Sequence, residues 1–178
     1  MLKNTTQTYG SVSKCLHWVI ALFIIGMFAL GLWMVDLSYY DSWYVKAPHY
    51  HKSIGMLLGA AMAFRLIWRW ANPKPKHIVS HKPWEVTLAS TVHGVLYLLV
   101  FGIIATGYLI PTADGRGIDV FNWFTVPAIG TLMENQEDIA GDAHYWLAMF
   151  LIGLVILHAL AAIKHHVLDK DATLKRML

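Results

Sequence analysis

The sequence has little cysteine and little charge. A single cysteine among 178 residues excludes a framework of disulfides, and it leaves a thiolate metal site or an iron–sulfur cluster short of ligands. Charged residues make up 14% of the chain, whereas a soluble domain contains about 25%. Aromatic residues make up 13%, which excludes a disordered chain. With 57% hydrophobic residues and a mean hydropathy of +0.48, the composition is typical of a protein embedded in lipid.

Four segments are candidates for membrane-spanning helices. Residues 18–35, 86–113 and 143–163 are runs of 18, 28 and 21 residues without a charge, and a helix needs about 20 apolar residues to cross the hydrocarbon. Residues 53–64 form a shorter run, which spans the membrane only if the flanking Lys52, Arg65 and Arg69 are tolerated at or near its ends. We therefore predict an all-α, integral membrane four-helix bundle. It is one domain over residues 1–178, with spans at about 15–35, 50–70, 86–111 and 142–165.

Lysine and arginine are unevenly distributed between the two ends of these spans. Eleven of the fourteen lie near the N-terminus, in residues 65–85 or in the C-terminal tail. Residues 36–52 and 113–142 hold the other three, together with eight of the eleven acidic residues. Because cytoplasmic loops are enriched in lysine and arginine, this pattern predicts that both termini are cytoplasmic.

The ten histidines are unusual in such an apolar chain. His51 and His144 are predicted near the outer ends of their spans, and His17 and His158 towards the inner side. On the last span, His144 and His158 are 14 residues apart, which returns a helix to within about 40° of the same face after a rise of about 21 Å. His93 lies at a depth that also suits the inner level. Three further histidines are expected to be solvated loop residues, namely His49, His77 and His81.

Imidazoles at two depths favour two haems in the bundle. Neutral imidazole is a good iron ligand, and facing helices can supply both axial positions. By depth, His51 pairs with His144 and His17 pairs with His158, although the spacing does not choose between His17 and His93. Iron with two histidine ligands has no open position, which favours electron transfer over oxygen binding. A competing interpretation is that each histidine is an ordinary hydrogen-bonded packing residue.

Several short motifs follow one another along the chain. They are KCLHW at 14–18, HKSIG at 51–55, RLIWR at 65–69, HGVLY at 93–97, GRG at 115–117, the histidine at 144, HALAAIKHH at 158–166 and DKD at 169–171. In this order they resemble the bacterial cytochrome b561 family of four-helix, di-haem b-type cytochromes of the inner membrane. Some members of that family are superoxide oxidases.

The resemblance implies specific roles for these residues. The haem-iron ligands are expected at His17, His51, His144 and His158. His93 and His165 are expected beside a quinone at the cytoplasmic side, where imidazoles can relay the protons that quinone reduction consumes.

Arg65 or Arg69 is expected to pair with a haem propionate, because a charge near the bilayer core needs a partner. The cofactors are then two haem b groups, with quinone as an exchangeable substrate, in a multi-pass protein of the bacterial inner membrane.

The electron donor at the outer face is left open by the sequence. Lys52 and Arg116 would attract superoxide, which is an anion, and a superoxide:quinone oxidoreductase is the expected activity if the chain is an enzyme. The acidic outer loops instead favour a basic periplasmic electron-transfer protein. Besides lipid and quinone, we expect no nucleic acid as a partner.

Two alternative functions are also open. The chain could be a haem-bearing membrane-anchor subunit that passes electrons for a separate catalytic partner. It could also be a haem-free protein that uses its histidines for transport or metal handling.

Overall fold

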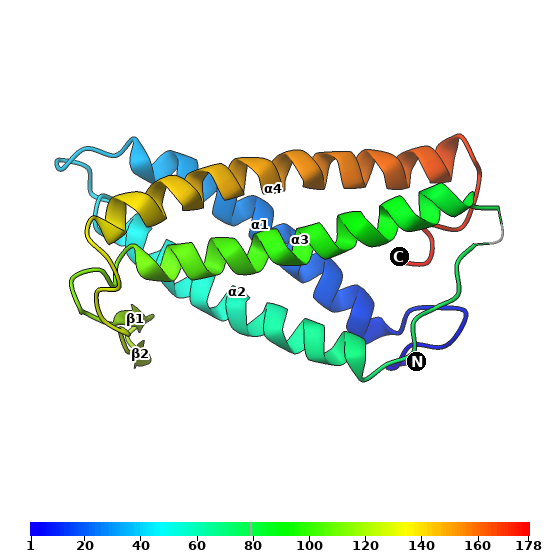
Figure 1. Ribbon diagram of the computed structural model, residues 1–178, viewed down its shortest axis with the longest axis horizontal. Helices are drawn as coiled ribbons and strands as arrows, with labels where there is room; N and C mark the ends of the chain where they lie inside the picture. The colour runs from blue at the N-terminus through cyan, green and yellow to red at the C-terminus, as the bar shows by residue number, and fades with distance from the viewer. Residues whose placement is uncertain (79) are drawn as a thin grey trace.

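Four long helices lie side by side in the computed structural model (Figure 1), which describes residues 1–78 and 80–178. Within these residues the helices are α1 (Ser11–Val35), α2 (Lys46–Trp70), α3 (Pro83–Leu109) and α4 (Gln136–Val167). They contain 25, 25, 27 and 32 residues, so their lengths are about 38 to 48 Å at 1.5 Å per residue. The predicted helical bundle is confirmed.

The helices begin three to six residues before the predicted spans, because their first turns are polar. At the start of α3, Pro83 occupies the first turn and the Glu85 carboxylate accepts a hydrogen bond from the Lys82 backbone N–H at 2.9 Å. In α4 the first turn contains Glu137 and Asp138, which are favourable near the positive end of a helix dipole. Polar first turns extend a helix without extending its apolar run.

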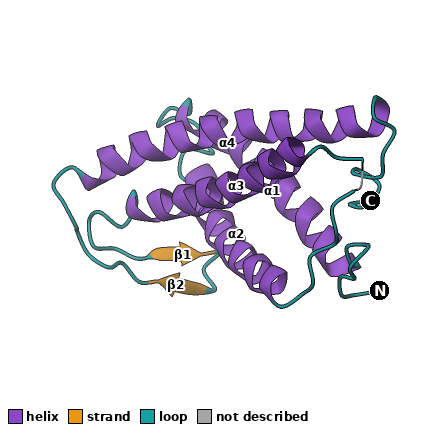
Figure 2. Cartoon of the chain, turned by 45° about the vertical axis from the view of Figure 1, so that its right-hand side comes forward, coloured by secondary structure: helices purple, strands orange, loops and turns teal. Residues whose placement is uncertain are grey.

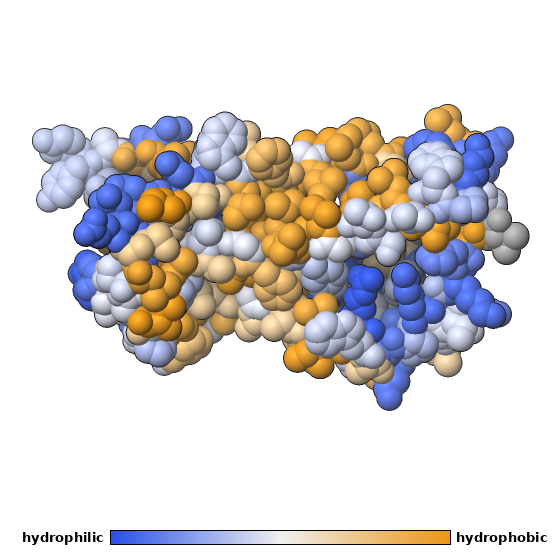
Figure 3. All heavy atoms as spheres, viewed as in Figure 1, coloured by the Kyte–Doolittle hydropathy of each residue, from blue (hydrophilic) through white to orange (hydrophobic). Residues whose placement is uncertain are grey.

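The surface of the bundle is apolar over its middle. Figure 3 shows hydrophobic side chains across the centre of one face and hydrophilic ones at both ends. Leu22, Leu98 and Phe150 are 71%, 73% and 67% exposed, and so much exposed apolar surface marks contact with lipid.

Among the described residues, α1, α3 and α4 are long and apolar enough to cross a membrane. The more highly charged α2 is not one of these three, so its crossing at about 50–70 stays a prediction.

The core holds one buried side chain from each helix: Ile20, Met62, Val100 and Leu151. Helices α1 and α3 each pack against both α2 and α4. Both chain termini and the α2–α3 linker lie at one end of the bundle (Figure 1). There Lys76 N–H donates to the Thr6 carbonyl at 2.9 Å, and the Arg176 guanidinium donates to the Lys76 carbonyl at 2.6 Å. We call this the terminal end.

The opposite end carries a β-hairpin that the sequence analysis treated as loop (Figure 2). Strands β1 (Ile118–Val120) and β2 (Phe124–Val126) pair antiparallel, and β1 packs against α2. The buried Ser53 hydroxyl accepts from the Phe121 backbone N–H at 3.0 Å and donates to the Asp119 carbonyl at 3.3 Å. We call this the hairpin end.

Candidate functional site

Two imidazoles face each other at the hairpin end. The ring centres of His51 on α2 and His144 on α4 are 6.2 Å apart, with an interplanar angle of 70°. His144 Nδ1 lies 2.9 Å from the Ile103 carbonyl oxygen, which can only accept a hydrogen bond, so Nδ1 carries the proton and the Nε2 lone pair is free. His51 Nδ1 is buried and has no hydrogen-bond partner among the described residues. Both side chains can therefore offer a nitrogen to a metal.

Two glycines give these imidazoles their space. A Cβ atom at Gly107 on α3 would lie 2.9 Å from His144 Cε1, and one at Gly31 on α1 would lie 3.3 Å from His51 Cε1. Any larger residue at Gly107 would therefore press on the ring of His144. The sequence analysis missed Gly107, because nothing in its spacing related it to a histidine on another helix.

Three imidazoles meet nearer the terminal end. His158 on α4 has its ring centre 6.3 Å from that of His17 on α1 and 5.2 Å from that of His93 on α3. His17 and His158 are half-buried, whereas His93 is more exposed. The contact between His93 and His158 could not be predicted from the depth of His93 alone.

The distances between ring centres show which of these imidazole pairs could hold a metal ion between them. Two metal–nitrogen bonds of about 2.0 Å, with roughly 1.1 Å from each nitrogen to its ring centre, put two axial imidazoles about 6.2 Å apart. The His51–His144 and His17–His158 pairs match this value. The His93–His158 contact is about 1 Å shorter, which is close enough for direct ring contact and too close for a metal between the rings.

Arg65 and Arg69 lie at the same level as His17. The Arg65 guanidinium donates a hydrogen bond to His17 Nδ1 at 3.1 Å. The guanidinium carbons of Arg65 and Arg69 lie 5.7 and 5.5 Å from the centre of the Tyr97 ring, which is cation–π distance. Tyr97 was also missed, although it is four residues after His93 and thus on the same face of α3.

His165 lies in the last turn of α4. Its Nδ1 atom lies 2.7 Å from Asp169 Oδ2 and 3.4 Å from Asp171 Oδ2. His81 joins this group with its Nε2 atom 2.8 Å from Asp171 Oδ2. The expectation that His81 is a solvated loop residue is wrong, since its side chain is only 16% exposed. The C-terminal tail folds back over the α2–α3 linker, which spacing alone could not predict.

The two predicted anion-attracting residues differ in their surroundings. Lys52 is half-buried beside His51. Arg116 is 86% exposed, and its Nε–H donates to Asp114 Oδ2 at 2.6 Å. Hydrogen bonds from Arg116 hold the pKa of Asp114 below its usual value. The charge of Arg116 is therefore offset locally, which weakens its attraction for an anion.

Comparison with known proteins identifies the family. The family model described as prokaryotic cytochrome b561 matches residues 8–178. The chain belongs to the prokaryotic cytochrome b561 family. This cytochrome b561 protein is 51% identical over 175 residues to Cytochrome b561 homolog 2 of Escherichia coli (strain K12), with 98% of this chain and 93% of that protein covered.

Two other relatives are also similar over nearly their whole length. Probable superoxide oxidase CybB of Yersinia pestis is 30% identical over 180 residues, covering 97% of this chain and 96% of that protein. Cytochrome b561 homolog 1 of Escherichia coli (strain K12) is 27% identical over 178 residues, covering 98% and 96%. Membership makes this chain a membrane electron-transfer protein of a family that binds haem b, and it removes the haem-free alternative.

Proposed function

We propose that this cytochrome b561 protein carries electrons across a bacterial inner membrane, from a donor at the hairpin end to a quinone at the terminal end. The observation that supports this best is the occurrence of two imidazole pairs with separations of 6.2 and 6.3 Å. Their members on α4 are 14 residues apart, which is about 21 Å along the helix. Bound haem b supplies reversible storage of single electrons, and two histidine ligands leave its iron without an open site.

The proposed ligands at the hairpin end are His51 and His144. The Ile103 carbonyl fixes the tautomer of His144 and aims its free nitrogen away from α3. Gly31 and Gly107 place no Cβ atom against the two rings. This level therefore has a histidine of fixed tautomer, a partner at the correct distance and two glycines that leave space for the rings.

The proposed ligands at the other level are His17 and His158. Arg65 donates a hydrogen bond to His17 Nδ1. His17 Nδ1 is therefore the acceptor, and the ring proton of His17 is on Nε2. Iron binding through Nε2 requires the proton to move to Nδ1 and Arg65 to find another acceptor. A propionate carboxylate is an acceptor of the right charge, and we assign it to Arg65 or Arg69, which Tyr97 holds at this level.

His93 is the proposed contact for quinone. Its ring centre lies 5.2 Å from that of His158, and its side chain is exposed. A quinone in contact with His93 would therefore lie beside a proposed haem ligand. Quinone reduction consumes protons as well as electrons. His165 is the proposed proton donor on the aqueous side. It lies seven residues beyond His158 on α4, which is about 10 Å closer to the terminal end.

The orientation follows from charge. The terminal end carries most of the lysines and arginines, so we assign it to the cytoplasm, and both termini with it. All four helices cross the membrane in this proposal. Helix α2 crosses because α1 and α3 flank it and because Arg65 and Arg69 have partners inside the bundle.

Superoxide is the first candidate donor. Lys52 lies next to the proposed ligand His51, and one relative bears the name Probable superoxide oxidase CybB. A second candidate role is that of a membrane-anchor subunit that receives electrons from a catalytic partner. It is favoured by the acidic loops of the hairpin end and by the pairing of Arg116 with Asp114, which together suit a basic protein better than a small anion.

The deciding experiment mixes purified, haem-loaded protein with a superoxide source and follows haem reduction by rapid absorption spectroscopy. Reduction by superoxide, followed by reoxidation on adding a soluble quinone analogue, supports the oxidase. Reduction only in the presence of a co-purified partner supports the anchor subunit. Haems that a chemical reductant reduces but that quinone does not reoxidise would refute transfer to quinone in either role.

Variants test the ligand assignment. His51→Ala and His144→Ala should each remove one haem and leave the other spectrally intact, whereas the exposed His77→Ala serves as a control with both haems retained. Loss of both haems from every variant to the same extent would contradict the assignment by level. His93→Gln and His165→Gln should keep both haems and slow quinone reduction. Unchanged turnover in either variant would remove that residue from the quinone site.

A further inference from the structure

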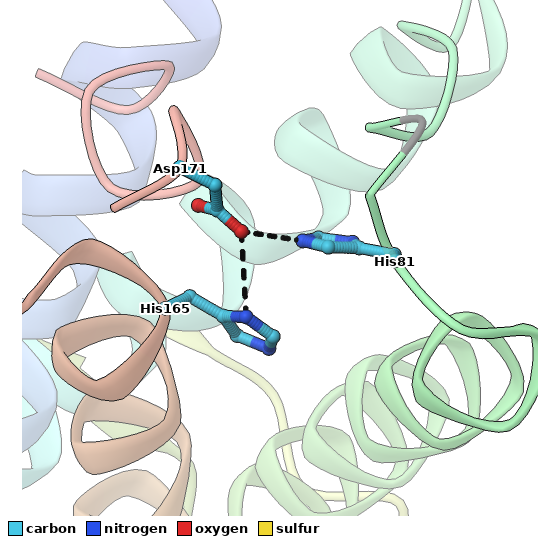
Figure 4. Close-up of side chains that lie close together, drawn as sticks. All are labelled: His81, His165 and Asp171. Carbon is cyan, nitrogen blue, oxygen red and sulfur yellow. Dashed lines mark hydrogen bonds and ion pairs between the residues drawn. The ribbon is translucent and has the colours of Figure 1, made fainter. Parts of the chain in front are cut away.

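Three segments distant in sequence converge at the terminal end. His81 precedes α3, His165 lies in the last turn of α4, and Asp171 lies in the C-terminal tail (Figure 4). Asp171 Oδ2 is 2.8 Å from His81 Nε2 and 3.4 Å from His165 Nδ1. These three atoms all lie within 4.8 Å of one another. The side chains are only 16%, 16% and 6% exposed.

We propose that His81, His165 and Asp171 form a binding site for a divalent transition-metal ion, with zinc as the type case. Two imidazole nitrogens and one carboxylate oxygen are a typical zinc ligand set that leaves a fourth position for water. Magnesium and calcium prefer sites made of oxygen ligands, so the two imidazoles select against them. The site is separate from the two imidazole pairs proposed for haem, but it shares His165 with the proposed quinone site, so bound zinc would compete with proton donation by that residue.

The position of His165 Nδ1 supports a ligand here. This nitrogen is buried, and it faces the carboxylates of Asp169 and Asp171 without the geometry of a hydrogen bond to any described residue. Asp169 Oδ2 is itself 2.6 Å from the Lys164 ammonium nitrogen, so that carboxylate already has a cation. Asp171 lies 3.4 Å from His165 Nδ1, close to the separation of about 3.3 Å between two ligands 2.0 Å from a tetrahedral metal.

The local charge favours a dication. The charged groups that form ion pairs with one another or with His165 here are the carboxylates of Glu85, Asp169 and Asp171 and the Lys164 ammonium. With neutral imidazoles, three negative charges and one positive charge leave a net charge of −2. A bound divalent ion would neutralise this charge in a site that is largely shielded from water.

Hydrogen bonds within the C-terminal tail and to α4 hold Asp171 in place. The Asp171 backbone N–H donates to the His165 carbonyl at 3.1 Å, and the Thr173 backbone N–H donates to Asp171 Oδ1 at 2.7 Å. The second carboxylate oxygen is thereby left to face the imidazoles. Lys170 has a left-handed backbone with φ of 54°, which is uncommon outside glycine, and this residue turns the chain between Asp169 and Asp171. Hydrogen bonds that orient a ligand residue in this way are typical of metal sites.

The test measures zinc on the haem-loaded protein in detergent, so that the proposed haem ligands are occupied. After equilibrium dialysis against buffered Zn²⁺, elemental analysis should find one zinc per chain in the wild-type protein. His81→Ala and Asp171→Asn should each weaken zinc binding by more than about 100-fold, since loss of a residue that only hydrogen-bonds to a ligand already costs about 10- to 100-fold in metal affinity. His77→Ala, an exposed histidine of the same linker, should bind zinc like the wild type.

A second measurement reports where the metal sits. Zinc should slow tryptic cleavage after Lys170 in the wild type and in His77→Ala, because the metal ties the tail to α4 and the linker. It should have no such effect in His81→Ala or Asp171→Asn, with an unchanged haem spectrum showing that the variants are folded. Wild-type protein that binds no zinc, or variants that bind it as tightly as the wild type, would overturn the proposal.

Discussion

The replacement Gly107→Ala tests the space behind the proposed ligand His144. The new Cβ atom would lie 2.9 Å from His144 Cε1 and 3.1 Å from its Nδ1 atom. Carbon atoms in ordinary contact are about 3.5 to 4.0 Å apart, so the ring must move away by roughly 0.6 Å or more. The hydrogen bond from Nδ1 to the Ile103 carbonyl opposes that movement, and metal–ligand bonds tolerate changes of only about 0.2 Å.

The expected effect is selective loss of the haem at the hairpin end. Overpacking of this kind costs about 1 to 3 kcal/mol, which corresponds to roughly a 5- to 150-fold loss of affinity at 1.4 kcal/mol per tenfold. The fold itself should persist, because alanine is favoured over glycine in a helix by about 1 kcal/mol. The haem proposed between His17 and His158 should be unaffected.

The assay is the number of haems per chain together with reduced-minus-oxidised difference spectra after haem titration. Gly31→Ala should show a smaller loss, because its Cβ would lie 3.3 Å from His51 Cε1. Gly94→Ala is the matched control on α3, since its Cβ would meet no described atom within 4 Å. Wild-type affinity in Gly107→Ala, or an equal loss in Gly94→Ala, would refute the reasoning.

Three further predictions concern the loops and the arginines. Ser53→Ala removes the Ser53 hydroxyl and its two hydrogen bonds to the hairpin, which should destabilise the packing of the hairpin on α2 by about 1 to 3 kcal/mol. The expected result is faster proteolysis between residues 115 and 135. Unchanged proteolysis would show that other contacts hold the hairpin. Hydrogen bonds from the Ser38 hydroxyl and backbone N–H hold the pKa of Asp41 below its usual value. Their stabilisation is therefore present at neutral pH and is lost as pH falls through the lowered pKa. NMR titration should show the pKa of Asp41 rising in Ser38→Ala, and an unshifted pKa would contradict this account. Arg65→Gln removes a cation 3.1 Å from His17 Nδ1 and should lower the reduction potential of the inner haem in a redox titration. The control is the remote Arg176→Gln. An equal fall of the reduction potential in this control would show that local charge is not the cause.

The helices could be predicted from the sequence because each of α1, α3 and α4 contains an uncharged run of at least 18 residues. Helix α2 was harder, because Lys52, Arg65 and Arg69 interrupt its apolar pattern. The hairpin was missed because its strands have three residues each. Its turn also places Phe121 and Asn122 at φ of 47° and 59°, without the Asn-Gly or Asp-Gly pair that signals such turns.

The levels of the histidines and the pairing of His51 with His144 were predicted from their positions along the spans, but the choice between His17 and His93 as the partner of His158 was not. Whether His158 lies opposite His17 or His93 depends on how α1 and α3 are rotated about their axes, which spacing within one helix does not determine. The ring separations of 6.3 and 5.2 Å express that rotation. His81 and Asp171 were beyond prediction for a similar reason, because their meeting depends on a reversal of the chain at Lys170.

The two guanidiniums stacked on Tyr97 have a consequence for the energised membrane. In the proposed orientation, an electron that moves from the hairpin end towards the terminal end approaches the negative side of the bilayer. A full crossing then costs about 2.3 kcal/mol per 100 mV. Arg65 and Arg69 place two positive charges at the far level, and their attraction offsets part of this uphill work. Without them, inward transfer would be less favourable by the same amount at every membrane potential.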